Sequence, residues 1–324
     1  MSTEATAAEP TTTPPVPVGR WAQRILLTNV VAQVAIVVTG GLVRLTGSGL
    51  GCPTWPDCTE GSLVPVAHQA EGFHKIIEFG NRTLTGVLVV IAVASLGAVT
   101  RGWWGHLVGT GEPTRRRPLV WLAAAVLAGI VVQAVLGGIT VLLGLNPVVV
   151  GAHLLVSLAV IAAAFVLYRR SKEAGDGSPV ATVRAELRTL SGVLVGVAGL
   201  VLVLGTVVTG SGPHSGDADT TLRLAVDPRV VSWLHADVVI AFVGLTIAFW
   251  LGAKLTDAPG SVRRAAELLL AACVLQAAIG YTQYFTGLPE LLVAVHMLGA
   301  CLVWLATLSV RLSTRTRAAG LLAA

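Results

Sequence analysis

The chain alternates long apolar runs with short polar segments that carry most of its charge. A helix needs roughly 20 apolar residues to cross the hydrocarbon core of a bilayer. Eight runs reach this length, and the segments between them are rich in Lys, Arg, Gly and Pro. We therefore predict eight membrane-spanning helices, over residues 22–44, 76–99, 118–142, 149–170, 188–210, 230–252, 264–286 and 290–312.

Composition supports this interpretation of the apolar runs. Of the 324 residues, 54% are hydrophobic and 12% are charged, and the mean hydropathy is +0.78. Such a balance differs from that of a soluble domain. The predicted fold class is all-α integral membrane, because a helix satisfies its own backbone hydrogen bonds inside lipid. Residues 1–20, rich in Thr, Pro and Ala, are expected to form a disordered tail.

Basic residues set the predicted orientation, since cytoplasmic loops carry an excess of Lys and Arg. With the first tail in the cytoplasm, that side receives all but five of the 22 basic residues, and a second cytoplasmic tail covers residues 313–324. Topology and contact with anionic membrane lipid account for the net charge of +5, so no nucleic-acid partner is expected. The basic residues predicted on the outer side are Arg44, Lys75, Arg82, Arg223 and Arg229.

An internal repeat divides the chain into two halves. Residues 129–155 align without gaps on the segment around residues 273–298, and the alignment matches a Gln and a His in each copy. Repeats in membrane proteins are related by pseudo-two-fold axes. We predict two pseudo-symmetric four-helix bundles, over residues 21–170 and 188–312, joined by a cytoplasmic linker at 171–187.

Four histidines lie in or at the start of predicted helices, all near the outer face: His74, His153, His235 and His296. An ionisable side chain at this depth is a functional candidate. Facing imidazoles from two helices can hold a heme through its iron. The alternative for any single histidine is a hydrogen bond to a neighbouring helix. Zinc or copper fits less well, because such sites gather three or more ligands or use Cys thiolates.

Further polar residues share one face of the second predicted helix. His74, Glu78 and Asn81 follow helical spacing, and Arg82 is adjacent. A carboxylate beside a heme site could relay a proton or stabilise a cationic intermediate. The alternative is an ion pair of Glu78 with Lys75 or Arg82.

Cys52 and Cys58 lie in the loop GLGCPTWPDC, on the predicted oxidising side of the membrane, where disulfides persist. We expect a disulfide between them. Its small ring either stiffens the loop or acts as a redox-active pair.

Taken together, these motifs resemble the heme A synthases. The resemblance rests on GGLVRLTGSGLGCPTWPDC at 40–58, HKIIEFGNRTLTG at 74–86, QAVLGGITVLLGLNPVVVGAH at 133–153 and VAVHMLG at 293–299, and extends over residues 21–312. The Gly-rich run followed by the cysteine loop is the most specific part. The resemblance implies an oxidoreductase that converts one methyl group of heme O into a formyl group, giving heme A for terminal oxidases, by two successive hydroxylations.

The resemblance also implies roles for individual residues. A heme b cofactor would lie between His235 and His296 in the second bundle. Heme O, the substrate, would bind the first bundle with His153 as an axial ligand and Glu78 as the essential carboxylate.

One departure from the family concerns the second ligand of the first bundle. Many relatives carry a histidine three residues after the glutamate, where this chain has Asn81 followed by Arg82. Asn81 and Arg82 are therefore expected to face the substrate heme, and either His74 serves as the second ligand or the iron keeps a single protein ligand.

Two competing functions are a diheme b-type electron-transfer subunit and a transporter. The subunit would place its hemes near opposite faces, whereas the four histidines lie near one face. The transporter would need helices broken at mid-membrane. The partners implied by the enzyme are heme O, delivered by a heme O synthase, and an electron acceptor that the sequence does not identify; a homo-oligomer stays open.

Overall fold

The structure is a computed structural model that describes residues 18–107, 116–217 and 222–317, with the side chains of residues 101–107 excluded. The predicted tails at 1–20 and 313–324 lie mostly outside these residues. Within them, eight helices are long and apolar enough to span a membrane, as predicted. They are α1 (Arg20–Leu45), α2 (His74–Leu107), α3 (Arg117–Leu142), α4 (Pro147–Ser171), α5 (Ala185–Ser211), α6 (Pro228–Leu255), α7 (Gly260–Phe285) and α8 (Glu290–Ser313).

The predicted helix boundaries agree with the observed ones to within a few residues, except at one end of α2. We expected that helix to end near residue 99, but it continues to Leu107. The helix therefore continues beyond the apolar run, and no proline occurs between residues 99 and 107 to interrupt it.

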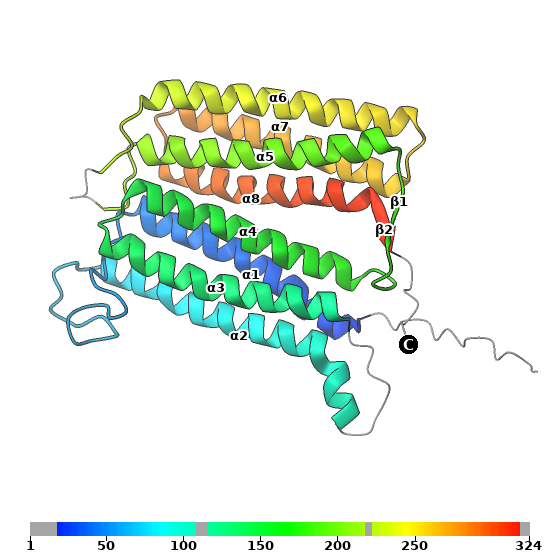
Figure 1. The fold of residues 1–324 in the computed structure, drawn as a ribbon. Coiled ribbons are helices and arrows are strands. Elements are labelled where there is room, and N and C mark those ends of the chain that lie inside the picture. The colour runs from blue at the N-terminus through cyan, green and yellow to red at the C-terminus, as the bar shows by residue number, and fades with distance from the viewer. Residues whose placement is uncertain (1–17, 108–115, 218–221, 318–324) are drawn as a thin grey trace, which may run out of the picture.

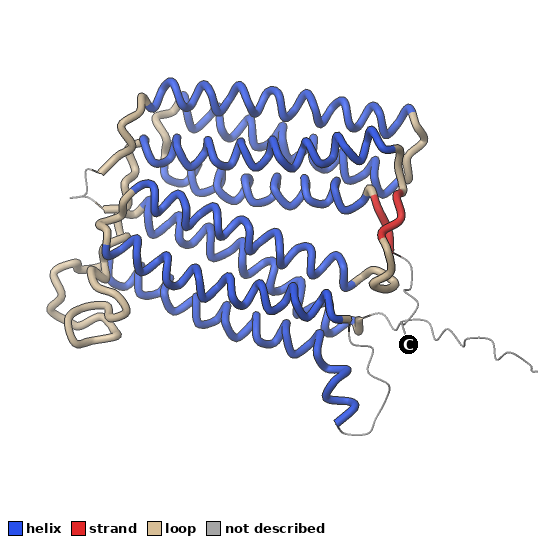
Figure 2. The backbone as a smooth tube through the Cα atoms, in the orientation of Figure 1, coloured by secondary structure: helices blue, strands red, loops and turns tan. Residues whose placement is uncertain are grey.

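The helices run side by side and expose two different ends (Figure 1). We call the end that carries residues 46–73 the cysteine-loop end. The opposite end, where α1 begins and α8 finishes, carries two short strands and is called the strand end. Helices dominate the fold, and loops gather mainly at the cysteine-loop end (Figure 2).

Helix contacts separate the chain into two sets of four. In the first set each helix contacts its sequence neighbours and α1 closes on α4; in the second, α5 closes on α8 in the same way. The sets meet through α1, α4, α5 and α8. The two predicted bundles and the pseudo-two-fold relation between them stay predictions.

Each set has its own buried core, and a further cluster joins them. Phe249, Leu194 and Leu269 are fully buried within the second set. Ile161 and Cys301 belong to a cluster that spans α1, α4 and α8. The two sets are thus packed against each other over apolar surface, which stabilises their relative position.

The linker between the two helix sets contains a short strand. Residues 171–187 were predicted to form a connecting loop, but Pro179–Ala181 forms strand β1, which pairs antiparallel with β2 (Arg315–Arg317). Two ion pairs reinforce this end: Asp176 is 2.9 Å from Arg116 and 3.1 Å from Arg170. The linker is therefore structured, because β2 pairs with its strand β1 and Arg116 and Arg170 form ion pairs with its Asp176.

At the cysteine-loop end, Arg44 connects the two sets. Its Nε donates to the carbonyl oxygen of His214 at 2.7 Å, and its Nη2 donates to that of Thr209 at 2.8 Å. The amide of Gly49 donates to the carbonyl oxygen of Gly216 at 2.7 Å. The sequence Thr-Gly-Ser-Gly occurs at residues 46–49, just after α1, and again at residues 209–212, at the end of α5. Both copies lie beside the contacts that join the halves.

Candidate functional site

Three of the predicted histidines lie near the cysteine-loop end of their helices: His153 on α4, His235 on α6 and His296 on α8. All three are partly buried. In each, Nδ1 is buried and has no hydrogen-bond partner among the described residues. A buried polar atom normally has a partner, so three such nitrogens at similar positions mark a shared feature of the two halves.

Each imidazole rests on a glycine of the preceding helix. A Cβ added to Gly137 or Gly205 would lie 3.5 Å from Cε1 of His153 or His235, respectively, and one added to Gly280 would lie 3.1 Å from Cε1 of His296. The glycines leave room for the ring directly against the backbone. They therefore position each imidazole between two helices.

The aligned glutamines fix the backbone beside two of the histidines. Nε2 of Gln133 donates to the carbonyl oxygen of His153 at 2.9 Å, and Nε2 of Gln276 donates to that of His296 at 2.8 Å. Gln133 also bonds to Ser157. The sequence repeat is thus reproduced as a structural contact, which chance similarity between apolar helices would not give.

The turns before α4 and α8 repeat as well. Leu145 and Leu288 both adopt a left-handed conformation with φ of 60°. Their amides donate to the carbonyl oxygens of Thr140 and Gln283, each at 2.8 Å. Because a non-glycine residue seldom adopts this conformation, the shared geometry shows that each half starts its histidine helix in the same way.

His235 and His296 form the clearest pair. Both lie near the cysteine-loop end of their helices, α6 and α8, which belong to one helix set. A pair of imidazoles from two helices would suit the iron of a heme. Among the described residues, no three His, Cys, Asp or Glu side chains gather in a group that could hold a metal ion. The donor set thus fits a heme better than a bare metal.

Asn81 of α2 lies against α1. A Cβ added to Gly40 would lie 3.9 Å from Nδ2 of Asn81. Oδ1 of Asn81 accepts a hydrogen bond from Oγ1 of Thr39 at 2.8 Å. Both contacts hold the amide against α1.

His74 lies elsewhere, at the exposed start of α2. Its Nδ1 is 2.8 Å from Oγ of Ser48, in the Thr-Gly-Ser-Gly segment. This contact attaches the first turn of α2 to the end of α1. His74 as an iron ligand stays a prediction, and its position favours a structural role.

Glu78 is 5% exposed and has a partner for each carboxylate oxygen. Oε1 accepts from Nη2 of Arg82 at 2.7 Å, and Oε2 accepts from the amide of Cys52 at 2.6 Å. The ion pair considered from the sequence is therefore present, with Arg82. Lys75 instead donates to the carbonyl oxygens of residues 66 and 67.

Arg82 binds the cysteine loop as well as Glu78. It donates to the carbonyl oxygens of Cys52, Thr54 and Asp57 at 2.8, 3.1 and 3.0 Å. Cys52 and Cys58 form the predicted disulfide, and both are fully buried. The loop is thus held against α2 by the pair that includes the candidate carboxylate.

Trp55, which the sequence analysis did not select, extends from this loop to α3. A Cβ added to Gly138 would overlap its indole ring, and the adjacent Gly137 contacts His153. The loop therefore reaches the neighbourhood of the first-half histidine. The signal in the sequence was a tryptophan in a loop between two prolines, Pro53 and Pro56.

Two other histidines and two other cysteines lie outside the proposed sites. Nε2 of His214 is 3.0 Å from the carbonyl oxygen of Leu288, in the turn before α8. Cys273 and Cys301 are buried and free. His106 lies on a segment whose side chains are outside the described residues.

Comparison with known proteins gives matches over most of the chain. A heme A synthase of Cereibacter sphaeroides (strain ATCC 17029) is 26% identical over 340 aligned positions, covering 86% of this chain and 83% of that protein. A heme A synthase of Geobacillus kaustophilus is 33% identical over 122 positions, 36% of this chain and 32% of that protein. One of Lysinibacillus sphaericus is 34% identical over 138 positions, 42% of this chain and 40% of that protein.

None of these relatives is named as a diheme electron-transfer subunit, so that alternative gains no support. The family match covers residues 23–308 and includes all eight helices at least in part. The chain therefore belongs to the COX15-CtaA family, the cytochrome oxidase assembly proteins.

Proposed function

We propose that this protein is a heme A synthase, an oxidoreductase of the membrane that converts the methyl group of heme O into the formyl group of heme A. The observation that carries the proposal is the repeated arrangement in which an imidazole lies on a glycine of the neighbouring helix, with its Nδ1 unpaired. The relatives named heme A synthase support the same activity.

The second helix set is proposed to hold heme b between His235 and His296. Gly205 and Gly280 orient the two rings, and Gln276 fixes the backbone of His296. When bound, such a heme supplies a centre for one-electron transfer. Neutral imidazole is the form that binds a metal ion.

The first helix set is proposed to receive heme O as substrate. His153 provides the axial ligand, with its ring against Gly137 and its backbone held by Gln133. Asn81, which stands where many relatives carry a histidine, is held by Thr39, and His74 lies at the exposed start of α2 beside Ser48. We therefore assign a single protein ligand to the substrate iron, which leaves the two halves with different tasks.

Glu78 is the proposed catalytic carboxylate. Two successive hydroxylations convert the methyl group to an alcohol and then to a geminal diol, which loses water to give the aldehyde. With water as the source of oxygen, each hydroxylation breaks one C–H bond, forms one C–O bond and releases two protons and two electrons, and the electrons pass to an external acceptor. Glu78 is poised to accept a proton because its carboxylate is buried, and Arg82 and the Cys52 amide stabilise its charged form.

The proposed orientation places both chain termini in the cytoplasm and the cysteine-loop end on the extracytoplasmic side. Arg169, Arg170, Arg184 and Arg188 at the strand end support it, because basic residues favour the cytoplasmic side. Heme O would then be handled near the outer face, supplied by a heme O synthase.

The test is to express the full chain in a host that makes heme O but not heme A, and to analyse extracted hemes by chromatography. We expect heme A to appear with the wild type. With Glu78→Gln, heme should stay bound and heme A should be lost. Glu60→Gln is the control and should keep activity, because Glu60 is an exposed glutamate of the loop segment 46–73. Bound heme O without any heme A in the wild type would refute the proposal.

A further inference from the structure

A pocket of about 420 Å³ opens at the strand end, far from the histidines along α5 and α8. Four elements build it: the strands β1 and β2, the first turns of α5 and the last turn of α8. Its lining residues are Pro179, Ala181, Ala185, Arg188, Thr189, Gly192, Arg311 and Arg315. This space is unrelated to the proposed oxidation chemistry.

The charges that line the pocket are all positive. Arg188, Arg311 and Arg315 contribute guanidinium groups, and no carboxylate lines the pocket. Nε of Arg315 is buried without a hydrogen-bond partner among the described residues. Burial, followed by the charges of Arg317 and Arg311, lowers the pKa of Arg315 from its usual range. A bound anion would reduce the electrostatic repulsion among the three guanidinium groups.

The acidic side chains near this pocket are already paired with other arginines. Asp176 is bound by Arg116 and Arg170. Glu173 is 3.6 Å from Nε of Arg317 and 3.9 Å from Nε of Arg170. Among the described residues, no carboxylate forms an ion pair with the three pocket arginines, although the charge of Glu173 acts on Arg315 at longer range.

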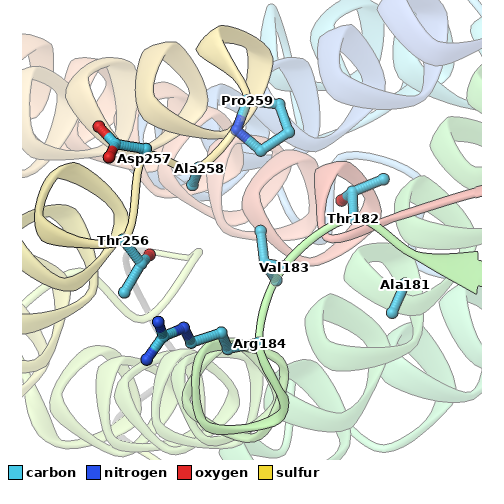
Figure 3. Close-up of a pocket in the computed structure, with 8 residues that line it drawn as sticks. All are labelled: Ala181, Thr182, Val183, Arg184, Thr256, Asp257, Ala258 and Pro259. Carbon is cyan, nitrogen blue, oxygen red and sulfur yellow. The ribbon is translucent and has the colours of Figure 1, made fainter.

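A second pocket nearby provides a comparison. It has a volume of about 400 Å³ and also uses Ala181, but it contains both a cation and an anion, Arg184 and Asp257. Figure 3 shows these two residues on different segments, Arg184 just before α5 and Asp257 in the turn after α6. Opposite charges at one pocket reduce its preference for an anionic ligand, so the concentration of positive charge is specific to the first pocket.

The position of the pocket points to a membrane ligand. Arg188 lies near the start of the α5 span and Arg311 near the end of the α8 span, the depth at which lipid headgroups meet water. A Cβ added to Gly192 would meet no atom within 4 Å. The space in front of this glycine is therefore free for a ligand that lies along α5. Further along that helix, Leu200 and Val203 are 48% and 41% exposed, which offers apolar surface to an acyl chain.

We propose that this pocket binds the phosphate group of an anionic phospholipid, with Arg188, Arg311 and Arg315 as its ligands. Guanidinium groups match phosphate oxygens with paired hydrogen bonds, and the hydroxyl of Thr189 adds a donor. The bound lipid would join β1, β2, α5 and α8 at the end of the fold where the linker returns.

Native mass spectrometry of the full chain in detergent tests the proposal. The probes are phosphatidylglycerol, phosphatidylcholine and inorganic phosphate, each titrated separately. We expect tighter binding of phosphatidylglycerol than of the other two. Its affinity should fall about fivefold for each arginine replaced, in Arg188→Gln and Arg315→Gln. Arg264→Gln, an exposed arginine at the start of α7 that does not line the pocket, should leave the affinity unchanged.

A steric variant tests the site without changing its charge. Gly192→Leu should fill the pocket and abolish tight lipid binding, whereas Gly199→Leu, which also meets open space on α5, should not. Equal lipid affinity in Gly192→Leu and the wild type would overturn the proposal. So would equal binding of phosphatidylcholine, or binding of inorganic phosphate alone. Arg188 is exposed, so its variant keeps the fold and reports on binding.

Discussion

Replacement of Arg82 by glutamine tests how the cysteine loop is held. The guanidinium makes five hydrogen bonds, two to Glu78 and one each to the carbonyl oxygens of Cys52, Thr54 and Asp57. The side chains of Arg82 and Glu78 are 22% and 7% exposed. Removal of one partner from a buried pair costs about 3–5 kcal/mol, and the partial exposure of Arg82 favours the lower value, about 3 kcal/mol.

Hydrogen exchange of the loop amides measures this energy directly. About 3 kcal/mol corresponds to roughly 100-fold faster exchange, and we expect this in residues 51–58 of Arg82→Gln. Lys75→Gln is the matched control, because Lys75 binds the same loop but not Glu78, and its effect on residues 51–58 should be below about threefold. Unchanged exchange in Arg82→Gln would show that the disulfide alone holds the loop, and would refute the role assigned to the ion pair.

Three further predictions concern the histidines and the disulfide. His296→Ala should abolish the low-spin heme b spectrum, whereas His214→Ala should retain it; a retained spectrum in the first variant would exclude His296 as a ligand. Gly280→Val should displace the imidazole of His296, since even a Cβ would lie 3.1 Å from its ring, and the absorption of bound heme should shift or disappear. Replacement of Cys52 and Cys58 by serine removes a disulfide between cysteines six positions apart. The loss should destabilise the loop by about 2 kcal/mol and speed the exchange of its amides; exchange as slow as in the wild type would contradict this prediction.

The helices could be predicted from the sequence because their cause is local. A run of apolar residues has one stable conformation in lipid, so α1 and α3–α8 were placed within a few residues. The repeat could also be predicted, since Gln133 and Gln276 keep the same spacing to their histidines. The disulfide followed from two cysteines in a short loop.

Contacts between distant segments could not be predicted in this way. Trp55 reaches Gly138 through the path of a long loop, which no local pattern encodes. The same holds for the hydrogen bond between Thr39 and Asn81, which joins residues of two different helices. Three arginines converge on one pocket only because a strand that follows α8 returns to the linker.

The pairing of β1 with β2 has a consequence for synthesis of the protein. β1 leaves the ribosome after the first four helices, but its partner β2 follows all eight. Insertion of the first half must therefore proceed while β1 still lacks its partner strand. Closure of this small sheet is a late event in biogenesis, and it can serve as a marker that the second half has been fully inserted beside the first.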